Sequence, residues 1–338
     1  MRKILYINLK NEKVKSVHQY DEHKINLSNN NLVFEAPSLA GYGVVGLNKL
    51  KVYDKNSLSQ TGGHFAHFMK CNGYDFLVFE GESDTPIYLY IDKESVKIKE
   101  ASHLIDKDYD KVVESIKEEL NTNELEIASI GLASVKKIDF SKIIFRNNKS
   151  CGKNGLGKLM ADKNIKAIVL KKQENLIPYD ISTLKKYNDS IAKKITNKSN
   201  ANWYDENNTC YGCCLNCKNT SLSKIKRYGF SEKEASDINK ISNFYGLDSV
   251  TLARGIDTYK KTFDTEIVDL ENFIEDIINN YSYYKPLFIN EGKFFKKNKT
   301  LQECEKLGFC KLLMEKDILN DKDKKILAKS ILGVSIAI

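Results

Sequence analysis

The sequence predicts an α+β protein, with a sheet-rich N-terminal domain over residues 1–175 and a mainly helical domain over residues 176–338. Short apolar runs and alternating apolar and polar residues dominate the first part, as is typical of strands. After Pro178 the apolar residues recur at helical spacing. The whole chain contains only four prolines, so long helices meet few breakers.

In the first domain, two strands at Lys3–Asn8 and Val14–Gln19 flank a predicted hairpin turn at residues 9–12. Further strands are expected at Leu32–Glu35, Tyr74–Phe79, Ile87–Ile91, Val96–Lys99, Ile127–Ile130 and Ile165–Leu170. Helical spacing predicts helices at His64–Lys70 and Tyr109–Leu120. In the second domain, helices are expected at Ile181–Ile195, Glu232–Phe244, Ser249–Phe263, Leu270–Ile278 and Asp323–Leu332. No internal repeat is evident in the sequence.

The net charge and the two ends of the sequence indicate which partners and which location to expect. The net charge is +8, but 53 basic residues are interleaved with 45 acidic ones, which favours a solvated surface and no nucleic-acid partner. The first ten residues lack the apolar run of a signal peptide, and the apolar segment Ile331–Ile338 is too short to span a membrane. We therefore expect no membrane partner and a cytoplasmic location. There thiols stay reduced, and clustered cysteines indicate a metal or catalysis.

Four of the eight cysteines lie between Cys210 and Cys217. Cys210, Cys213 and Cys217 have a C-x2-C-x3-C spacing, which lets three thiolates converge on one soft metal centre. A fourth ligand has to come from elsewhere, and the candidates are Cys71, Cys151, Cys214, Cys304 and Cys310. The residues alone leave two metal sites open, a [4Fe–4S] cluster and a structural zinc ion. A set of unligated buried thiols is the remaining alternative.

Two further patterns indicate no site. Gly152–Lys158 has the G-x4-G-K spacing of a phosphate-binding loop, but Leu159 stands where that motif needs Ser or Thr to hold magnesium. His64 and His67 lie three residues apart without a nearby carboxylate, and we expect a surface or half-buried pair.

A series of segments in a fixed order resembles the aldehyde ferredoxin oxidoreductase family, as a shortened and divergent member. In chain order the segments are Tyr42–Val45, Gly62–Phe65, Asn72–Gly81, Pro86–Ile91, Ala101–His103, Ile127–Gly131, Gly152–Gly157, Asp162–Ile168, the cysteine loop, Gly246–Asp248 and Leu307–Cys310. The resemblance covers most of residues 1–262 and about 300–335, and it implies the fold of a truncated family member.

The resemblance implies a [4Fe–4S] cluster with Cys210, Cys213, Cys217 and Cys310 as ligands, carried by the helical domain. It also implies a tungsten or molybdenum bis-pterin with magnesium, supported by the sheet-rich domain. The cofactor-binding positions implied are Gln60, Gly62, Lys153, Asn154, Asn243, Asp248 and Glu305.

Several of these positions depart from the family's pattern. Gly41 stands where the family has an arginine near Tyr42, and Gln60 replaces an asparagine. Lys153-Asn154 replaces Arg-Gly, Asn243 replaces an aspartate, and Glu305 replaces another. A family glutamate after the cysteine loop has no counterpart. A family histidine is also missing, since no histidine follows His103. No catalytic residue can be assigned.

By this resemblance the protein is an oxidoreductase that acts on aldehyde or oxo groups and passes electrons through the cluster to ferredoxin or another carrier. The alternative is a non-catalytic [4Fe–4S] protein that transfers electrons, senses, or partners a full-length relative or a second copy of itself. A zinc-stabilised scaffold is the third choice.

Overall fold

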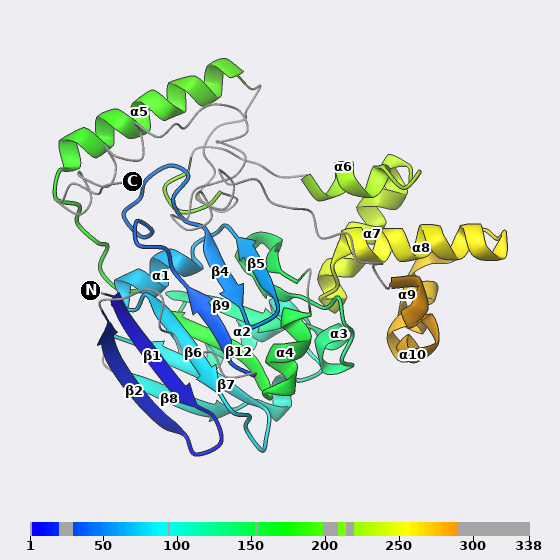
Figure 1. Ribbon diagram of the computed structural model, residues 1–338, viewed down its shortest axis with the longest axis horizontal. Coiled ribbons are helices and arrows are strands. Elements are labelled where there is room, and N and C mark those ends of the chain that lie inside the picture. The colour runs from blue at the N-terminus through cyan, green and yellow to red at the C-terminus, as the bar shows by residue number, and fades with distance from the viewer. Residues whose placement is uncertain are drawn as a thin grey trace.

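The computed structural model describes residues 2–19, 30–93, 95–152, 155–198, 209–213 and 220–288 (Figure 1). All described strands lie between Arg2 and Lys171, with short helices among them. Every described element from Ile181 onward is a helix. The α+β class predicted from the sequence is confirmed. Within the described residues, no helix combines the length and apolar character that crossing a membrane requires.

The first sheet has the strand order β2-β1-β6-β3-β4-β5. Its strands are β1 (Arg2–Asn8), β2 (Lys13–Gln19), β3 (Leu32–Glu35), β4 (Leu50–Tyr53), β5 (Leu58–Thr61) and β6 (Phe76–Glu80). β1 and β6 run parallel, with Ile4 opposite Phe76, and the other neighbours are antiparallel.

The second sheet has the order β11-β10-β9-β12-β7-β8. Its strands are β7 (Ile87–Asp92), β8 (Ser95–Glu100), β9 (Leu125–Ile130), β10 (Ile143–Phe145), β11 (Lys149–Cys151) and β12 (Ile165–Lys171). Helix α2 (Tyr109–Leu120) packs against β9, and the short helices η1 (Ser102–Leu104), α3 (Leu132–Val135) and η2 (Arg146–Asn148) lie in the connections.

The two sheets are a structural repeat of each other. When the strands are counted from one to six within each sheet, both described sheets have the order 2-1-6-3-4-5. In each sheet the first and sixth strands are parallel. In each, a glycine-containing turn and a seven-residue helix, α1 (Phe65–Cys71) or α4 (Leu156–Asp162), precede the sixth strand. This repeat was not evident in the sequence.

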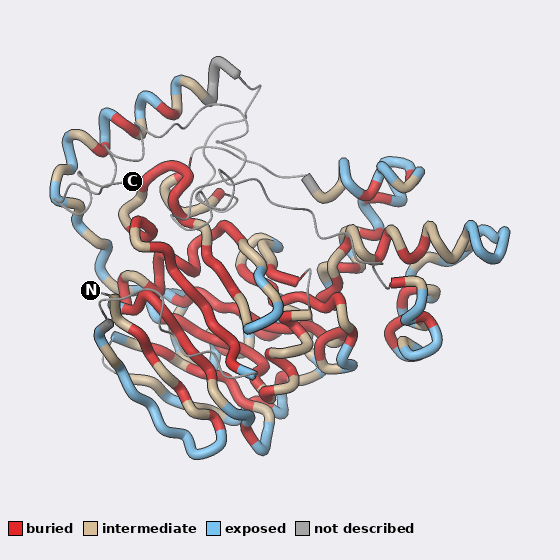
Figure 2. Tube along the Cα trace, viewed as in Figure 1, coloured by how far each residue is buried: buried red, intermediate tan, exposed pale blue. Residues whose placement is uncertain are grey.

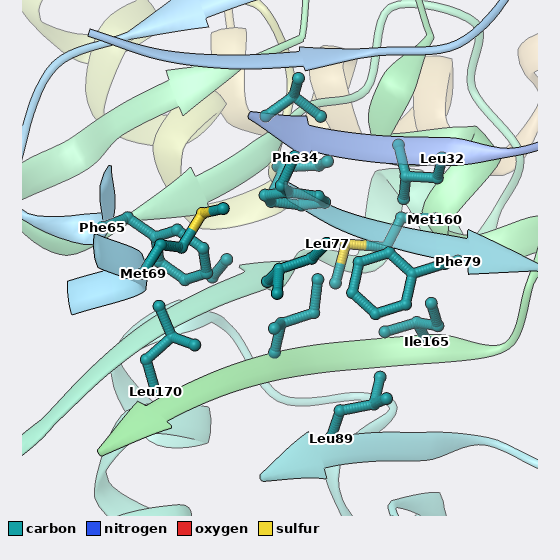
Figure 3. Packing of buried hydrophobic residues seen from close by; sticks show 14 of the residues in the cluster. Leu32, Phe34, Phe65, Met69, Leu77, Phe79, Leu89, Met160, Ile165 and Leu170 are labelled. Atoms are coloured by element: carbon teal, nitrogen blue, oxygen red, sulfur yellow. The ribbon is translucent and has the colours of Figure 1, made fainter. Parts of the chain in front are cut away.

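The main core lies between the two sheets and these short helices, and it is the most continuously buried part of the molecule (Figures 2 and 3). Phe34 of the first sheet contacts Phe65 of α1, with 5.7 Å between ring centroids, and Phe145 of the second sheet lies 5.2 Å from Phe65. Burial of these apolar side chains therefore stabilises the packing of the two sheets against each other.

The helices after the sheets are α5 (Ile181–Lys198), α6 (Thr220–Lys226), α7 (Glu232–Tyr245), α8 (Ser249–Phe263), α9 (Leu270–Asn279), α10 (Tyr281–Tyr284) and η3 (Lys285–Phe288). Helices α6 to α10 and η3 share a second core with α3. Ser141 forms an isolated bridge to Leu247, and the amide of Lys142 donates to the carbonyl of Gly246 at 2.8 Å. The α7–α8 junction is therefore tied to the segment that enters β10.

The strands and helices expected from periodicity are present with small shifts at their ends. Leu32–Glu35, Tyr109–Leu120 and Ser249–Phe263 coincide with β3, α2 and α8. The sequence did not predict β4, β5, β10, β11, α3, α4, α6 and α10, all seven residues or shorter. The expected helix Asp323–Leu332 lies outside the described residues.

Candidate cofactor and metal site

The glycine turn Gly62-Gly63 joins β5 to α1 and receives the cysteine loop. The amide of Tyr211 donates to the carbonyl of Gly63 at 3.2 Å. A Cβ atom added at Gly62 would lie only 2.3 Å from Sγ of Cys210. Only glycine lets the thiol approach the turn this closely.

A second contact holds the loop from the other side. Gly212 has a positive φ of 69°, and a Cβ atom there would lie 2.4 Å from the carbonyl carbon of Gly43. The buried amide of Asn48 accepts a bond from Gly41 N at 3.0 Å and donates to the carbonyl of Tyr211 at 2.6 Å. The cysteine loop is thus fixed against residues 41–48 by backbone as well as side-chain contacts.

His64, directly before α1, and His67 on α1 also face the loop. They are 9% and 5% exposed, so the expectation of a surface or half-buried pair was wrong. Nε2 of His64 lies 3.2 Å from the carbonyl oxygen of Thr209. Nδ1 of His67 donates to the carbonyl of Gly41 at 3.0 Å, because a carbonyl can only accept. Both histidines therefore position the loop.

The ring of His67 is stacked on the ring of Tyr211, with 3.4 Å between centroids and 10° between planes. Burial lowers the pKa of His67 to about 4, although the bond to Gly41 opposes the shift. The imidazole is therefore neutral near pH 7.

The structure describes two of the four predicted cluster ligands. Cys210 is partly exposed, Cys213 is buried, and Cys213 N donates to the carbonyl of Cys210 at 2.9 Å in a tight turn. Cys217 and Cys310 lie outside the described residues, as do Lys153, Asn154 and Glu305. Within the described part of the chain, no three His, Cys, Asp or Glu side chains gather to hold a metal.

The repeat places the second glycine turn beside the first, because β5 and β11 are equivalent edge strands that contact each other. The Ser59 hydroxyl hydrogen-bonds the Cys151 thiol, whose pKa burial raises to about 12. A Cβ atom added at Gly63 would lie 3.6 Å from Cγ of Lys149. Gly62 and Gly152 each follow directly on one of these strands.

Each repeat supplies a lysine at the same position, directly before its fourth strand. Lys49 precedes β4 and Lys142 precedes β10. A Cβ atom at Gly62 would lie 3.8 Å from Nζ of Lys49, and one at Gly152 would lie 2.1 Å from Cβ of Lys142. The two glycine turns therefore each have a lysine packed against them.

Lys142 is 4% exposed, and its Nζ donates to Oδ1 of Asn243 at 2.6 Å. Burial lowers its pKa to about 8, and the charge of Asp248 opposes that shift. Asp248 also caps α8 by accepting from Thr251 N at 2.9 Å. Two of the predicted cofactor positions, Asn243 and Asp248, thus lie around the buried cation beside Gly152.

Gln60 lies on β5, one residue before Thr61 and two before Gly62. Its side-chain nitrogen is buried and has no hydrogen-bond partner in the described part of the chain. A buried donor without an acceptor is unfavourable, so this atom suits a ligand that supplies one.

Sequence reasoning missed Asn48, His67, Lys49 and Lys142. The signal that reveals the two lysines is the repeated order of strand, glycine turn and short helix. The equivalence of Lys49 and Lys142 lies in the strand register, because Leu50 pairs with Thr61 and Ile143 pairs with Cys151, so each lysine stands opposite its glycine. No such signal exists for His67, whose partner Tyr211 is far away in the sequence.

Comparisons with known proteins give consistent relationships. Residues 13–172 match the family described as "Aldehyde ferredoxin oxidoreductase, N-terminal domain". The tungsten-containing aldehyde ferredoxin oxidoreductase of Pyrococcus abyssi is 31% identical over 172 residues, which are 49% of this chain and 28% of that protein. The enzyme of the same name from Thermococcus kodakarensis is 25% identical over 287 residues, and the match covers 64% of this chain and 47% of that protein.

A more distant relative is the "Aliphatic sulfonate oxidoreductase, WOR-like subunit" of Pyrococcus furiosus, 22% identical and covering 50% of this chain and 36% of that protein. Among solved structures, the active site complex BamBC of benzoyl coenzyme A reductase superposes with a TM-score of 0.70 at 20% identity, covering 84% of this chain and 61% of that one. That likeness shows the fold. The chain spans less than half the length of these curated relatives.

Proposed function

Residues 13–172 place the chain in the aldehyde ferredoxin oxidoreductase family, and from that premise we propose that it is a divergent redox protein acting on aldehyde or oxo groups. Cys210, Cys213, Cys217 and Cys310 would hold a [4Fe–4S] cluster, which would supply a path for electrons out of the site. The cofactor is a tungsten or molybdenum bis-pterin, and the electron acceptor is ferredoxin or another carrier.

One observation carries this proposal: the cysteine loop rests directly on the first of two repeated glycine turns, with Cys210 against Gly62. Soft thiolates suit iron. A cofactor made of two like halves suits two turns that are equivalent in fold and adjacent in space. The loop joins these two features in one place.

The residues present fit such a cofactor. The unpartnered nitrogen of Gln60 offers a donor at the first turn. Lys142 is a buried cation whose ammonium donates to the neutral amide of Asn243, so a negative ligand beside it is favourable. Lys49 supplies the equivalent charge in the other repeat. When bound, a tungsten or molybdenum bis-pterin supplies the metal centre at which the substrate loses two electrons.

In this scheme the chain's own residues bind the cofactor and position the cysteine loop. Lys49 and Lys142 offset negative charge, Gln60 donates one hydrogen bond, and the α7–α8 junction covers the second turn through Asn243 and Asp248. Asn48 and His67 hold the cysteine loop in place. No described side chain is assigned as a proton donor or acceptor for the substrate.

A second candidate is a non-catalytic [4Fe–4S] protein that transfers electrons or partners a larger relative. The chemistry of the described side chains around Gly62 and Cys210 favours it. They are lysines and buried histidines whose ring nitrogens already contact carbonyl oxygens. Zinc in place of the cluster is the third choice.

The test is metal and cofactor analysis of protein purified without oxygen. We expect brown protein with about four irons and four sulfides per chain, and loss of both in Cys210→Ser but not in Cys71→Ser. Cys71 is a free cysteine outside the proposed ligand set, so it controls for the loss of a thiol. Colourless protein with one zinc per chain would contradict the proposal.

Lys142→Met separates a ligand-binding role from a structural one. Removing the buried ammonium relieves its desolvation cost but leaves Oδ1 of Asn243 without its donor, so the free energy of unfolding should change by no more than about 1–3 kcal/mol, while the amount of pterin recovered falls. Lys158→Met, which removes a partly exposed partner of Asp139, serves as the control. Unchanged pterin recovery in Lys142→Met would show that this cation does not bind the cofactor.

A further inference from the structure

Helix α5 has the largest excess of positive charge among the helices that the structure describes. Its 18 residues include five lysines and a single aspartate. By contrast α9 has three acidic residues and no basic one, and α2 has four acidic residues against two lysines. Among the described helices, net positive charge is therefore greatest on α5.

Three of these lysines lie on the exposed side of α5. Lys185, Lys186 and Lys193 are exposed, whereas Leu184, Tyr187 and Ile191 are buried. Figure 2 shows this alternation along the helix. A shallow hollow of about 450 Å³ is lined by Lys186, Asp189, Ser190, Lys193 and Lys194. We call Lys185, Lys186 and Lys193 the basic face.

Contacts on the other side of α5 connect it to the cysteine loop. Val45 N donates to Oδ1 of Asn188 at 3.1 Å, and Nδ2 of Asn188 donates to the carbonyl of Gly43 at 3.1 Å. Gly43 is the residue against which Gly212 packs. The middle of α5 is therefore separated from Cys210 and Cys213 by one loop.

We propose that the basic face is the docking surface for a redox partner with an acidic face, which exchanges one electron with the centre held by the cysteine loop. This inference rests on the proposed function. In the exchange one metal centre is oxidised by one electron and the partner's centre is reduced by one, and no bond forms or breaks.

The chemistry of the surface favours this partner over other anions. Electron-transfer encounters are small and transient, and opposite charges steer them to fast association. An 18-residue helix is about 27 Å long, which suits an interface of that size. Single-stranded nucleic acid is bound by aromatic stacking as well as charge, and the one aromatic side chain of α5, Tyr187, is buried.

The experiment measures binding of an oxidised acidic [4Fe–4S] ferredoxin to the full chain by calorimetry at several salt concentrations. The test variant is Lys185→Glu with Lys186→Glu and Lys193→Glu. The control variant is Lys13→Glu with Lys97→Glu and Lys111→Glu, three exposed lysines on β2, β8 and α2. Both variants change the net charge equally.

We expect binding that weakens with salt, a loss of at least about tenfold in the α5 variant, and a change below about twofold in the control. Equal weakening in both variants, or none in the α5 variant, would overturn the proposal. So would α5-dependent binding to phosphatidylserine vesicles or to single-stranded RNA without binding of ferredoxin.

Iron and sulfide are measured on the same samples. Cluster-free protein that still binds ferredoxin through α5 would contradict the proposed function and support the docking surface. Cluster-containing protein that does not bind would overturn the docking surface alone.

Discussion

The ring of Tyr211 lies flat against the ring of His67, with their centroids 3.4 Å apart. Tyr211 stands between the two described cysteines of the loop, and His67 belongs to the helix that follows the Gly62-Gly63 turn. The stack therefore joins the thiols to the sheet domain directly. The stack is a contact within the chain that positions the cysteine loop, and substitutions at His67 can test this role.

His67→Phe keeps an aromatic ring on Tyr211 but removes the donor to Gly41. The carbonyl of Gly41 then loses its partner, which should reduce the free energy of unfolding by about 1–3 kcal/mol. His67→Leu also removes the stack and should cost about 1 kcal/mol more. Urea unfolding measures both, with His103→Leu as the exposed control. Equal losses in the two His67 variants would mean that stacking contributes nothing.

His67 also predicts how stability depends on pH. Its folded pKa is about 4, below the ordinary 6.5, so the unfolded chain takes up the proton first. The stability contributed by the neutral imidazole is fully present above pH 6.5. As the pH falls from 6.5 towards 4, the free energy of unfolding decreases by an amount on the order of 3 kcal/mol. Unfolding of the wild type and His67→Phe across this range isolates the effect. Parallel curves for the two proteins would contradict it.

Gly212 and Gly229 form a matched pair, since both have positive φ, at 69° and 85°. A Cβ atom at Gly212 would lie 2.4 Å from the carbonyl carbon of Gly43, whereas nothing lies within 4 Å at Gly229. Gly229→Ala should therefore show only the backbone cost, about 1–2 kcal/mol. Gly212→Ala should in addition displace the cysteine loop and lower the iron content per chain. Equal iron in both variants would show that this close approach is not needed.

The sequence predicted the fold where elements are long and periodic. In α2 and α8 the apolar spacing runs over several turns, and both boundaries were correct. Strands β5 and β11 read Leu58-Ser59-Gln60-Thr61 and Lys149-Ser150-Cys151, which have no strand pattern of their own. Pairing with β4 and β10 makes them strands. Local sequence does not contain that information.

The repeat was hidden for the same reason. Its two halves share topology and two lysines but few side chains: Thr61 of the first occupies the place of Cys151 in the second, since they pair with Leu50 and Ile143 in equivalent register. Spacing alone identified the cysteine loop. The residues that hold it, Asn48 and His67, become visible only when their contacts with Tyr211, more than 140 positions away, are known.

The last prediction concerns catalysis. We expect the isolated chain to oxidise aldehydes weakly or not at all, while its cluster exchanges electrons. The resemblance implies that Gly41 stands where the family has an arginine, and here a Cβ atom would lie 2.8 Å from Cβ of Lys70 with φ at 94°. This backbone cannot accept an arginine without moving. Asn243 accepts from the Lys142 ammonium as a neutral amide, at a position where the resemblance implies an aspartate in the family.

Placing an acid or base beside the reacting atoms usually contributes about 10²–10⁴ in rate, and no described residue is assigned that role. The measurement is viologen-coupled oxidation of a panel of aldehydes by protein supplied with tungsten or molybdenum, together with extraction of the pterin. Cluster without pterin would agree with an electron-transfer or partner role. Robust turnover with pterin recovered would contradict the prediction, because the lysines and Gln60 would then suffice to hold an active cofactor.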